Sequence, residues 1–409
     1  MPVEHAPGTV TLLDSRTAWI RLAAVVALST LGGVGMWSVV VALPHVQAEF
    51  GATRGGASLP YALTMLGFGA GGILMGRLVD RYGAMRPLLG ATVMLSAGYF
   101  AAAAAPGLTI FALVQGIMIG GLGASAAFGP LMADASLWFH RRRGIAVALA
   151  ASGNYLAGAV WPPVLTWLIA AHGWRTAHVV VGVTLLATML PLALALRARA
   201  PGTRGGAAAE GGAPDHPLGL TRNALTAVLA TAGVACCVAM AMPQVHIVAY
   251  CADLGYGVAR GAEMLSLMLA CGIASRLASG LIADRIGGLR TLLLGGVLQG
   301  ASLSLFLFFD GLASLYVLSA LFGLMQGGIV PSYAVIIREH FPARDVGARL
   351  GIVLMATLVG MALGGWLSGV VFDLTGSYRA AFLNGVAWNA ANVFVVATLL
   401  LRRARPAPA

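Results

Sequence analysis

One arginine interrupts a long apolar stretch and is the strongest candidate for chemistry in this chain. Arg276 lies eight residues before Asp284, which is about 12 Å along a helix at roughly 1.5 Å per residue. A guanidinium keeps its proton in proteins, and an arginine at the centre of a bilayer costs about 2.5–3.5 kcal/mol on insertion scales. This pattern favours an anion-binding arginine, and the alternative is an internal counter-ion for packing. Small residues share its helical face and would leave room for a ligand: Gly272, Ser279, Gly280 and Ala283.

The acidic residues of the chain do not offer Arg276 an obvious partner. No acidic residue lies deep in a predicted span, since Asp134 and Glu263 fall near span ends. Intramembrane charges are usually paired with one another or serve a substrate pathway. The anion that Arg276 binds is therefore expected to be the ligand.

His246 is the main titratable candidate besides Arg276. Its ordinary pKa of about 6.5 suits a proton carrier. It lies 24 residues past Arg222, about 36 Å along an unbroken helix, so it is expected near the outer mouth unless Pro243 bends the helix. Two interpretations stay open, namely a coupling or gating role together with Tyr250, and an interfacial histidine.

Four further polar residues inside predicted spans are candidate substrate contacts. Each is more often an interhelical tie than a ligand contact. Asn154 and Tyr155 rank first because Gly153 beside them leaves a gap in the side-chain surface. The other two are Tyr333 and Asn384.

Neither a cofactor nor an enzyme site is expected. The cysteines Cys236, Cys237, Cys251 and Cys271 form no CxxC pair and no metal-ligand spacing. The chain has no P-loop, HExxH, GxSxG or dinucleotide fingerprint. No cofactor and no metal is therefore predicted, and the protein is not expected to be an enzyme.

The elements that carry these residues must be membrane helices. Hydrophobic residues make up 59% of the chain, charged residues 10%, and the mean hydropathy is +0.87. A soluble protein keeps about 25% charged residues, whereas a helix of about 20 apolar residues crosses a hydrocarbon core. The sequence predicts an all-α membrane protein with twelve transmembrane helices, at 19–43, 55–76, 87–105, 108–131, 144–168, 177–196, 223–250, 262–283, 291–309, 312–337, 350–372 and 380–401.

The net charge of +11 reports topology rather than a nucleic-acid partner. All 25 basic residues are arginines, and most fall at the termini or in even-numbered loops. This asymmetry predicts a multi-pass protein of the plasma (inner) membrane with both termini in the cytoplasm. The N-terminal segment has no apolar core and does not resemble a cleaved signal peptide. The arginines in odd-numbered loops are Arg54, Arg175, Arg260 and Arg379.

The chain is expected to consist of two six-helix halves. A stretch rich in glycine and proline, 197–222, is predicted to be a cytoplasmic linker between the halves 19–196 and 223–401. Residues 1–18 are predicted to be a cytoplasmic N-terminal segment and 402–409 a cytoplasmic tail.

A repeated loop relates the two halves. At an offset of 204 residues, five positions of the first half recur in the second. Parallel six-helix repeats indicate a transporter with a site between its halves. The matching sets are Gly76, Asp80, Arg81, Gly83 and Arg86, and Gly280, Asp284, Arg285, Gly287 and Arg290.

These two loops resemble the loop motif of the major facilitator superfamily. The resemblance implies that fold, with two pseudo-symmetric halves and loop contacts that latch the cytoplasmic side and are remade during alternating access. The segment from Arg276 to Asp284 also resembles the eighth helix of the monocarboxylate porter family, which places its substrate-carboxylate arginine at this spacing. The stretch 138–148 is similar to that family's approach to helix five.

Two departures from the monocarboxylate porters concern coupling. Gly272 stands where that family often has an aspartate, and the chain has no lysine for the first helix. The resemblance therefore implies a secondary transporter of a small organic anion, a monocarboxylate, coupled to protons or working by exchange, without fixing the coupling residues. A monomer in the lipid bilayer is expected.

Two rival functions remain. A drug or metabolite exporter of the same superfamily would carry glycines leading to Gly-Pro in helix five; Gly144 and Gly153 have the right gap, but Ala157 and Gly158 replace the final pair. A non-transporting sensor with this fold would be expected to carry a cytoplasmic domain or a long tail, and 402–409 is short.

Overall fold

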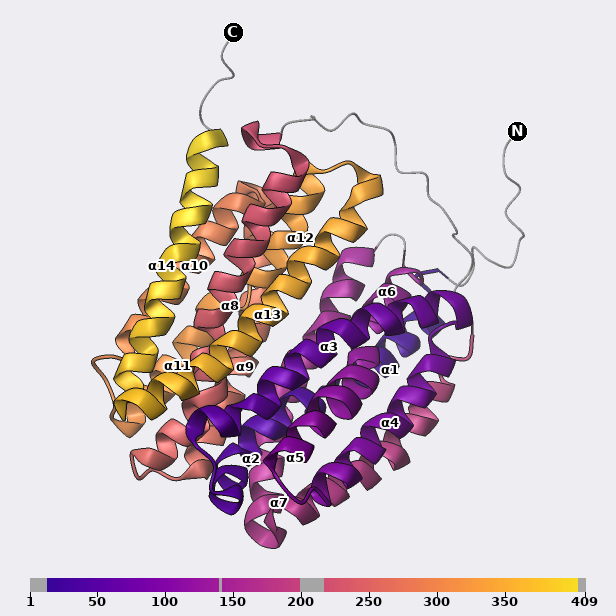
Figure 1. Cartoon of the computed structure of the whole chain (residues 1–409). Coiled ribbons are helices and arrows are strands. Elements are labelled where there is room, and N and C mark those ends of the chain that lie inside the picture. Colours follow the sequence, from indigo (N-terminus) through magenta and orange to yellow (C-terminus); the bar gives the residue numbers. More distant parts are fainter. Residues whose placement is uncertain (1–12, 140–141, 199–216, 404–409) are drawn as a thin grey trace. The chain divides into compact units, whose positions relative to one another are not determined.

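The computed structural model describes residues 13–139, 142–198 and 217–403, which form helices and no strand (Figure 1). Residues 1–12, 199–216 and 404–409, which hold most of the predicted terminal segment, linker and tail, lie outside the described residues. Contacts divide the chain into two compact units. Unit 1 comprises Met1–Ala42 and Leu66–Ala207, and unit 2 comprises Leu43–Met65 and Ala208–Ala409.

Unit 1 contains most of the helices of the first predicted half. The first part of α2 and the later part of α3 belong to it, together with a stretch of π-helix and 3₁₀-helix in the fourth predicted span. Its elements are α1 (Arg16–Gly32), α2 (Val34–Phe50), α3 (Arg54–Tyr82), α4 (Met85–Ala103), α5 (Leu108–Val114), η2 (Gln115–Gly123), η3 (Ala124–Ala127), α6 (Gly129–Ser136) and α7 (Arg143–Leu194).

Unit 2 contains the second predicted half and, in addition, the hairpin Leu43–Met65, where α2 ends and α3 begins. Helix α8 is its centre, with α9, α13 and α14 packed around it (Figure 1). Its other elements are η4 (Pro217–Gly219), α8 (Arg222–Asp253), α9 (Val258–Ile286), α10 (Gly288–Leu305), α11 (Leu312–Gln326), α12 (Ile329–His340), α13 (Ala343–Thr375) and α14 (Tyr378–Arg403).

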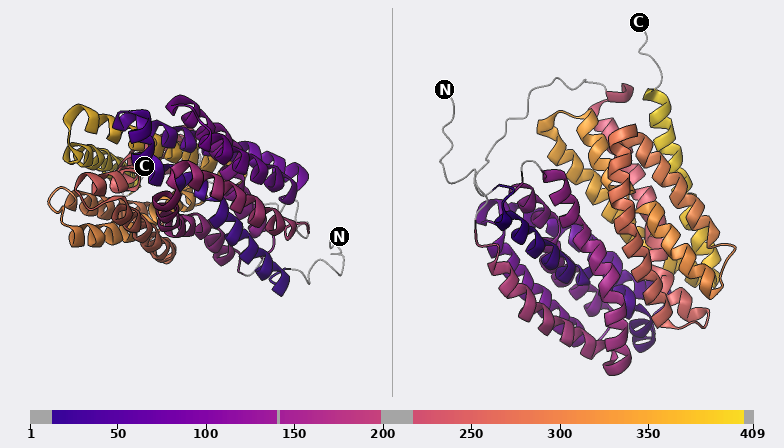
Figure 2. Two further views of the ribbon diagram at one scale, coloured as in Figure 1. Left: turned by 90° about the horizontal axis from the view of Figure 1, so that it is seen from below. Right: turned by 180° about the vertical axis from the view of Figure 1, so that it is seen from behind.

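The predicted spans coincide with helices. The spans 144–168 and 177–196 are joined in α7, which bends at Gly173 with φ 78°. Among the described residues, nine helical stretches are long and apolar enough to cross a membrane. Helices α4 and α10, with 19 and 18 residues, are not among these stretches. The prediction of an all-α membrane fold is confirmed, and Figure 2 shows the same helices from below and from behind.

Helix α8 is central because no charged residue interrupts it between Arg222 and Asp253. A helix that is apolar on all sides is stable only when surrounded by others. Its buried residues meet those of α10, α12, α13 and α14 in one hydrophobic core, which includes Leu229, Cys236, Leu292, Ile336, Val353 and Val396.

The repeated loops have the same backbone turn in both halves. Gly83 has φ 80° and Gly287 has φ 83°, a region that a side chain disfavours, so both loops turn at a glycine. A Cβ at Gly76 or Gly280 would meet no atom within 4 Å in the described residues. They leave open space here rather than bringing two helices together. The charged residues of both loops are exposed: Asp80, Arg81, Arg86, Asp284, Arg285 and Arg290.

A buried ion pair connects α1 and α6 within unit 1. The Nε and Nη2 atoms of Arg21 donate to the two carboxylate oxygens of Asp134, both at 3.0 Å. The side chains are only 5% and 8% exposed, and the guanidinium lies 4.5 Å from the ring centre of Trp138. Asp134, expected near a span end, therefore has its own cation on α1.

Candidate functional site

Arg276 lies on α9, ten residues before the end of that helix at Ile286, and is half-buried. The helix is continuous from Val258 to Ile286, so the arginine is held on a regular segment rather than on a loop. Its own carbonyl accepts a hydrogen bond from the Ser279 hydroxyl at 3.0 Å. A guanidinium in this position can offer a planar, doubly hydrogen-bonding face to a carboxylate.

The small residues near Arg276 have two different uses. A Cβ on Gly327 would overlap the carbonyl oxygen of Gly272, and one on Gly328 would overlap the Ser279 side chain. Gly272 and Ser279 therefore bring α9 against the junction of α11 and α12, which is packing rather than the cavity lining that was expected. Gly280 does face open space, because nothing lies within 4 Å of a Cβ built there.

A buried amide pair lies next to this junction. The Gln244 Nε2 atom on α8 donates to Gln326 Oε1 on α11 at 3.0 Å, and the residues are 2% and 0% exposed. The remaining amide atoms, Gln244 Oε1 and Gln326 Nε2, have no hydrogen-bond partner among the described residues. Gln326 precedes Gly327, whose contact with Gly272 is one helical turn from Arg276. Sequence reasoning did not single out Gln244, although a glutamine after Pro243 in an apolar helix is a detectable signal.

His246 is completely buried in unit 2, at 0% exposure. Its Nε2 atom lies 2.7 Å from the Gly365 carbonyl oxygen, to which it donates, and its Nδ1 atom lies 3.4 Å from the Tyr378 hydroxyl. Helix α8 continues through Pro243 to Asp253, so the proline does not fold the chain back. Half-buried Tyr250 packs edge-on against Tyr378 at 5.2 Å between ring centres.

Arg54 joins this histidine network and is a second residue, after Gln244, that sequence reasoning did not identify as functional. Its Nη1 atom donates to the Tyr378 hydroxyl at 2.7 Å, and its Nη2 atom donates to both oxygens of Asp253 at 3.1 and 3.0 Å. Asp373 on α13 accepts the backbone N–H groups of Arg54 and Gly55 at 2.7 Å each, which caps the start of α3. The sequence offered one signal, an arginine in a predicted odd-numbered loop, where arginines are few.

The other predicted contact residues are spread over both units. Tyr333 lies in the core of unit 2, with its hydroxyl 3.5 Å from Cys236 Sγ, and Asn384 is half-buried on α14. Asn154 and Tyr155 belong to α7 of unit 1, where the Asn154 carbonyl oxygen accepts a hydrogen bond from the Trp37 indole at 3.3 Å. Their roles in binding stay predictions.

The gap at Gly153 is filled by a neighbouring helix of unit 1. A Cβ there would lie 2.5 Å from the Ser29 Cβ atom and 3.1 Å from the Val26 carbonyl oxygen on α1. The glycine therefore permits close approach of α1 and α7, as small residues commonly do in membranes. Among the described residues, no group of three His, Cys, Asp or Glu side chains is placed to hold a metal ion.

Comparison with known proteins agrees with this architecture. The chain is 30% identical to Monocarboxylate transporter 13 of Rattus norvegicus over 75% of this chain and 71% of that protein. It is 24% identical to the Agnestins efflux protein AgnL12 of Paecilomyces divaricatus, over 79% of this chain and 73% of that protein.

A solved structure shows the same fold. It is the crystal structure of a bacterial homolog to the human lysosomal transporter Spinster, in an inward-facing and occupied conformation, with a TM-score of 0.75 at 12% identity, covering 97% of this chain and 100% of that one. The proteins of similar sequence and fold are transporters rather than enzymes. A family model described as the Major Facilitator Superfamily matches residues 25–298 and 264–409, and the chain belongs to that superfamily.

Proposed function

We propose that this protein is a secondary active transporter that moves a small organic anion, a monocarboxylate, by alternating access. The observation that carries the proposal is Arg276, a permanent cation half-buried on a membrane-spanning helix. The similarity to Monocarboxylate transporter 13 supports the same substrate class.

Arg276 binds the carboxylate of the substrate. Its fixed fork of N–H groups matches the two carboxylate oxygens, and the low dielectric of the membrane interior strengthens the attraction. The contact of Gly272 with Gly327 holds the helix of Arg276 in register with α11. Asn154, Tyr155, Tyr333 and Asn384 are the further contacts that the sequence predicts.

The amide pair Gln244–Gln326 supplies neutral hydrogen-bonding groups on α8 and α11, the second of which packs against the helix of Arg276. Two of its atoms have no partner in the described part of the chain, namely one acceptor, Gln244 Oε1, and one donor, Gln326 Nε2. Buried amide atoms without partners favour a ligand that carries its own polar group. A hydroxyl or carbonyl group beside the carboxylate has the required chemistry.

Coupling to protons or exchange against a second anion completes the proposal. His246 and Tyr250 are the coupling or gating candidates, because both contact Tyr378, and Tyr378 accepts a hydrogen bond from Arg54. The loop motifs serve the conformational change, and the arginine distribution supports cytoplasmic termini. The transporter works as a monomer in the plasma (inner) membrane.

Uptake into proteoliposomes tests the role of Arg276. We expect Arg276→Gln to lower the apparent affinity for lactate, pyruvate or a related monocarboxylate by at least roughly tenfold, because a charge-assisted bidentate contact is lost. Arg260→Gln is the matched control, since Arg260 lies on the same helix with its side chain 53% exposed. Normal uptake affinity in a folded Arg276→Gln protein would refute the proposal.

Imposed gradients separate the coupling modes. Uptake driven by an inward proton gradient indicates symport, whereas uptake that requires internal carboxylate indicates exchange. Both measurements use the wild-type protein.

A metabolite exporter with proton antiport is the second candidate, favoured by the similarity to a named efflux protein. In that case, export of the substrate from the cytoplasmic side should be driven by protons that move in the opposite direction. Export should also tolerate Arg276→Gln. A carboxylate substrate that needs Arg276 would exclude this candidate.

A further inference from the structure

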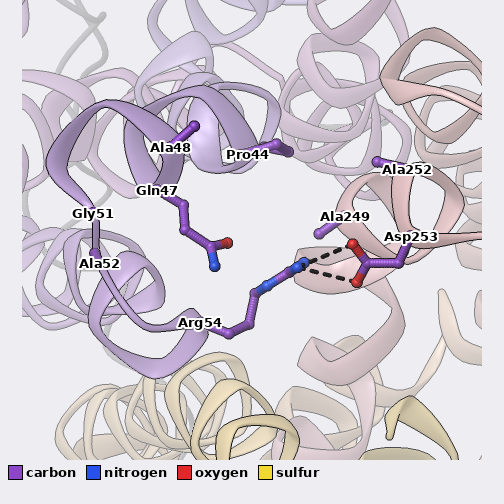
Figure 3. A pocket seen from close by; sticks show the side chains of 9 residues that line it. All are labelled: Pro44, Gln47, Ala48, Gly51, Ala52, Arg54, Ala249, Ala252 and Asp253. Carbon is purple, nitrogen blue, oxygen red and sulfur yellow. Dashed lines mark hydrogen bonds and ion pairs between the residues drawn. The ribbon is translucent and has the colours of Figure 1, made fainter. Parts of the chain in front are cut away.

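A pocket of about 340 Å³ lies beside Arg54 in unit 2 (Figure 3). The end of α2, the turn before α3 and the last turn of α8 form it, so none of its lining residues belongs to α9. Four alanines, Pro44, Gly51 and the Gln47 side chain line the pocket, and the charged lining residues are Arg54 and Asp253. Figure 3 shows Asp253 facing the guanidinium of Arg54 from α8.

The cation of this pocket is fixed in place. The Arg54 side chain is 9% exposed, its guanidinium carbon lies 4.9 Å from the ring centre of Phe372, and Tyr378 accepts its Nη1 hydrogen at 2.7 Å. Its backbone N–H is held by Asp373. A charge this deeply buried requires an anion in contact with it, because an uncompensated buried charge is costly.

The anion of this pocket is held less firmly. The Asp253 side chain is 38% exposed, and both of its oxygens share the single Nη2 atom of Arg54. The Nε atom of Arg54 is buried and has no hydrogen-bond partner among the described residues. The fork of Nε and Nη2 that a carboxylate prefers is therefore only half used.

From this asymmetry we infer that the pocket is a second anion-binding site, where the carboxylate of a small organic acid replaces that of Asp253 on Arg54. The incoming carboxylate uses both Nε and Nη2, and the side chain of Asp253, already partly exposed, turns toward the solvent. The guanidinium keeps a bound anion throughout the exchange.

The pocket also limits the size of the ligand. Its volume is at the low end of the roughly 300–1,000 Å³ range of small-molecule sites. Alanine walls accept a short apolar chain, and the Gln47 amide can hydrogen-bond one further polar group. A monocarboxylate of a few carbon atoms fits this description, and the choice of that class as probe rests on the proposed function.

Exchange at Arg54 has a mechanical consequence. The Asp253 contact connects the last turn of α8 to the start of α3, so its replacement by a free carboxylate removes this link between the two segments. The arginine distribution predicts this end of unit 2 to face the outside. Ligand arrival would then loosen the contact at that surface.

Calorimetric titration of the purified full-length protein tests the inference. The probes are lactate and propionate, with propionamide as the uncharged control, and the background is Arg276→Gln, which removes the proposed transport site. We expect one carboxylate site to remain in that background. Asp253→Asn should tighten it roughly tenfold because the competing anion is gone, and Arg54→Gln should abolish it.

Arg260→Gln in the same background is the matched control and should leave the titration unchanged. Equal affinity with and without Asp253→Asn, retained binding in Arg54→Gln, or no carboxylate binding in the Arg276→Gln background would each overturn the inference. If Arg54→Gln does not fold, Asp253→Asn decides alone. The proposed function fails separately, through normal uptake by the Arg276→Gln protein.

Discussion

Two buried arginines of this protein, Arg21 in unit 1 and Arg54 in unit 2, are paired with aspartates in different ways. Arg21 uses its Nε and Nη2 atoms on the two oxygens of Asp134, and both side chains are buried. Arg54 places both oxygens of Asp253 on one nitrogen, and Asp253 is partly exposed beside a pocket.

The difference separates a structural ion pair from an exchangeable one. A fork-paired carboxylate with no access to water has no alternative partner, so its contribution is to stability. A carboxylate that is hydrated and shares one donor can be displaced by another carboxylate. Both arginines are buried, so the two ion pairs are distinguished by the hydrogen-bond geometry and the exposure of the aspartate.

The largest expected effect comes from the structural pair. Asp134→Ala leaves Arg21 buried without its anion, and breaking a buried pair costs about 3–5 kcal/mol. The apparent free energy of unfolding in mixed detergent micelles measures this loss. A loss no greater than that of Asp253→Ala would remove the distinction between the two pairs.

Tyr378→Phe should have the next largest effect. The substitution leaves the buried Nη1 donor of Arg54 without its acceptor, which costs about 1–3 kcal/mol. The midpoint of thermal unfolding measures the stability. The affinity in the carboxylate titration shows whether the Arg54 guanidinium is still held in its binding position. Tyr256→Phe, whose hydroxyl lies at an exposed hydrogen bond, is the control. An unchanged midpoint would show that Arg54 is held by other contacts.

Asp373→Ala tests whether the backbone of Arg54 is anchored independently of Asp253. The carboxylate accepts two N–H groups at the start of α3, and losing such a cap costs about 1 kcal/mol. Hydrogen exchange at the amides of Arg54 and Gly55 should accelerate. Exchange at wild-type rates would mean that Asp373 does not anchor this turn.

The smallest effect is expected at an exposed pair. Glu263→Ala removes a carboxylate that pairs with Arg260 and accepts the Tyr316 hydroxyl, and the Glu263 and Arg260 side chains are 43% and 53% exposed. Such pairs contribute little to stability. The unfolding midpoint should stay within error of wild type, and a shift as large as that of Tyr378→Phe would show that exposure does not rank these interactions.

Much of the fold follows from local sequence pattern. The apolar spans and the repeated loops identify the helices and their family, and the matched glycines Gly83 and Gly287 share one turn conformation. These features depend on residues that are close in the chain or on one repeat. A single sequence contains that information.

The candidate site was less predictable for a physical reason. Arg54 and Asp253 are separated by 199 residues, and nothing in either segment marks the other as its partner. Small residues are equally ambiguous, because Gly272 looks the same whether it lines a cavity or packs against Gly327. Helix length alone placed His246 near an outer mouth, but it could not show the contacts that the histidine makes with Gly365 of α13 and Tyr378 of α14.

The pairing of Arg21 with Asp134 also sets an order of events during synthesis. The two residues are 113 positions apart, so at about 5–20 residues per second the ribosome makes the arginine roughly 6–23 s before the aspartate. During that interval the cation, six residues into α1, must stay near the lipid headgroups or the insertion machinery. Helix α1 can therefore reach its final packing, with Arg21 paired to Asp134, only after α6 has been inserted.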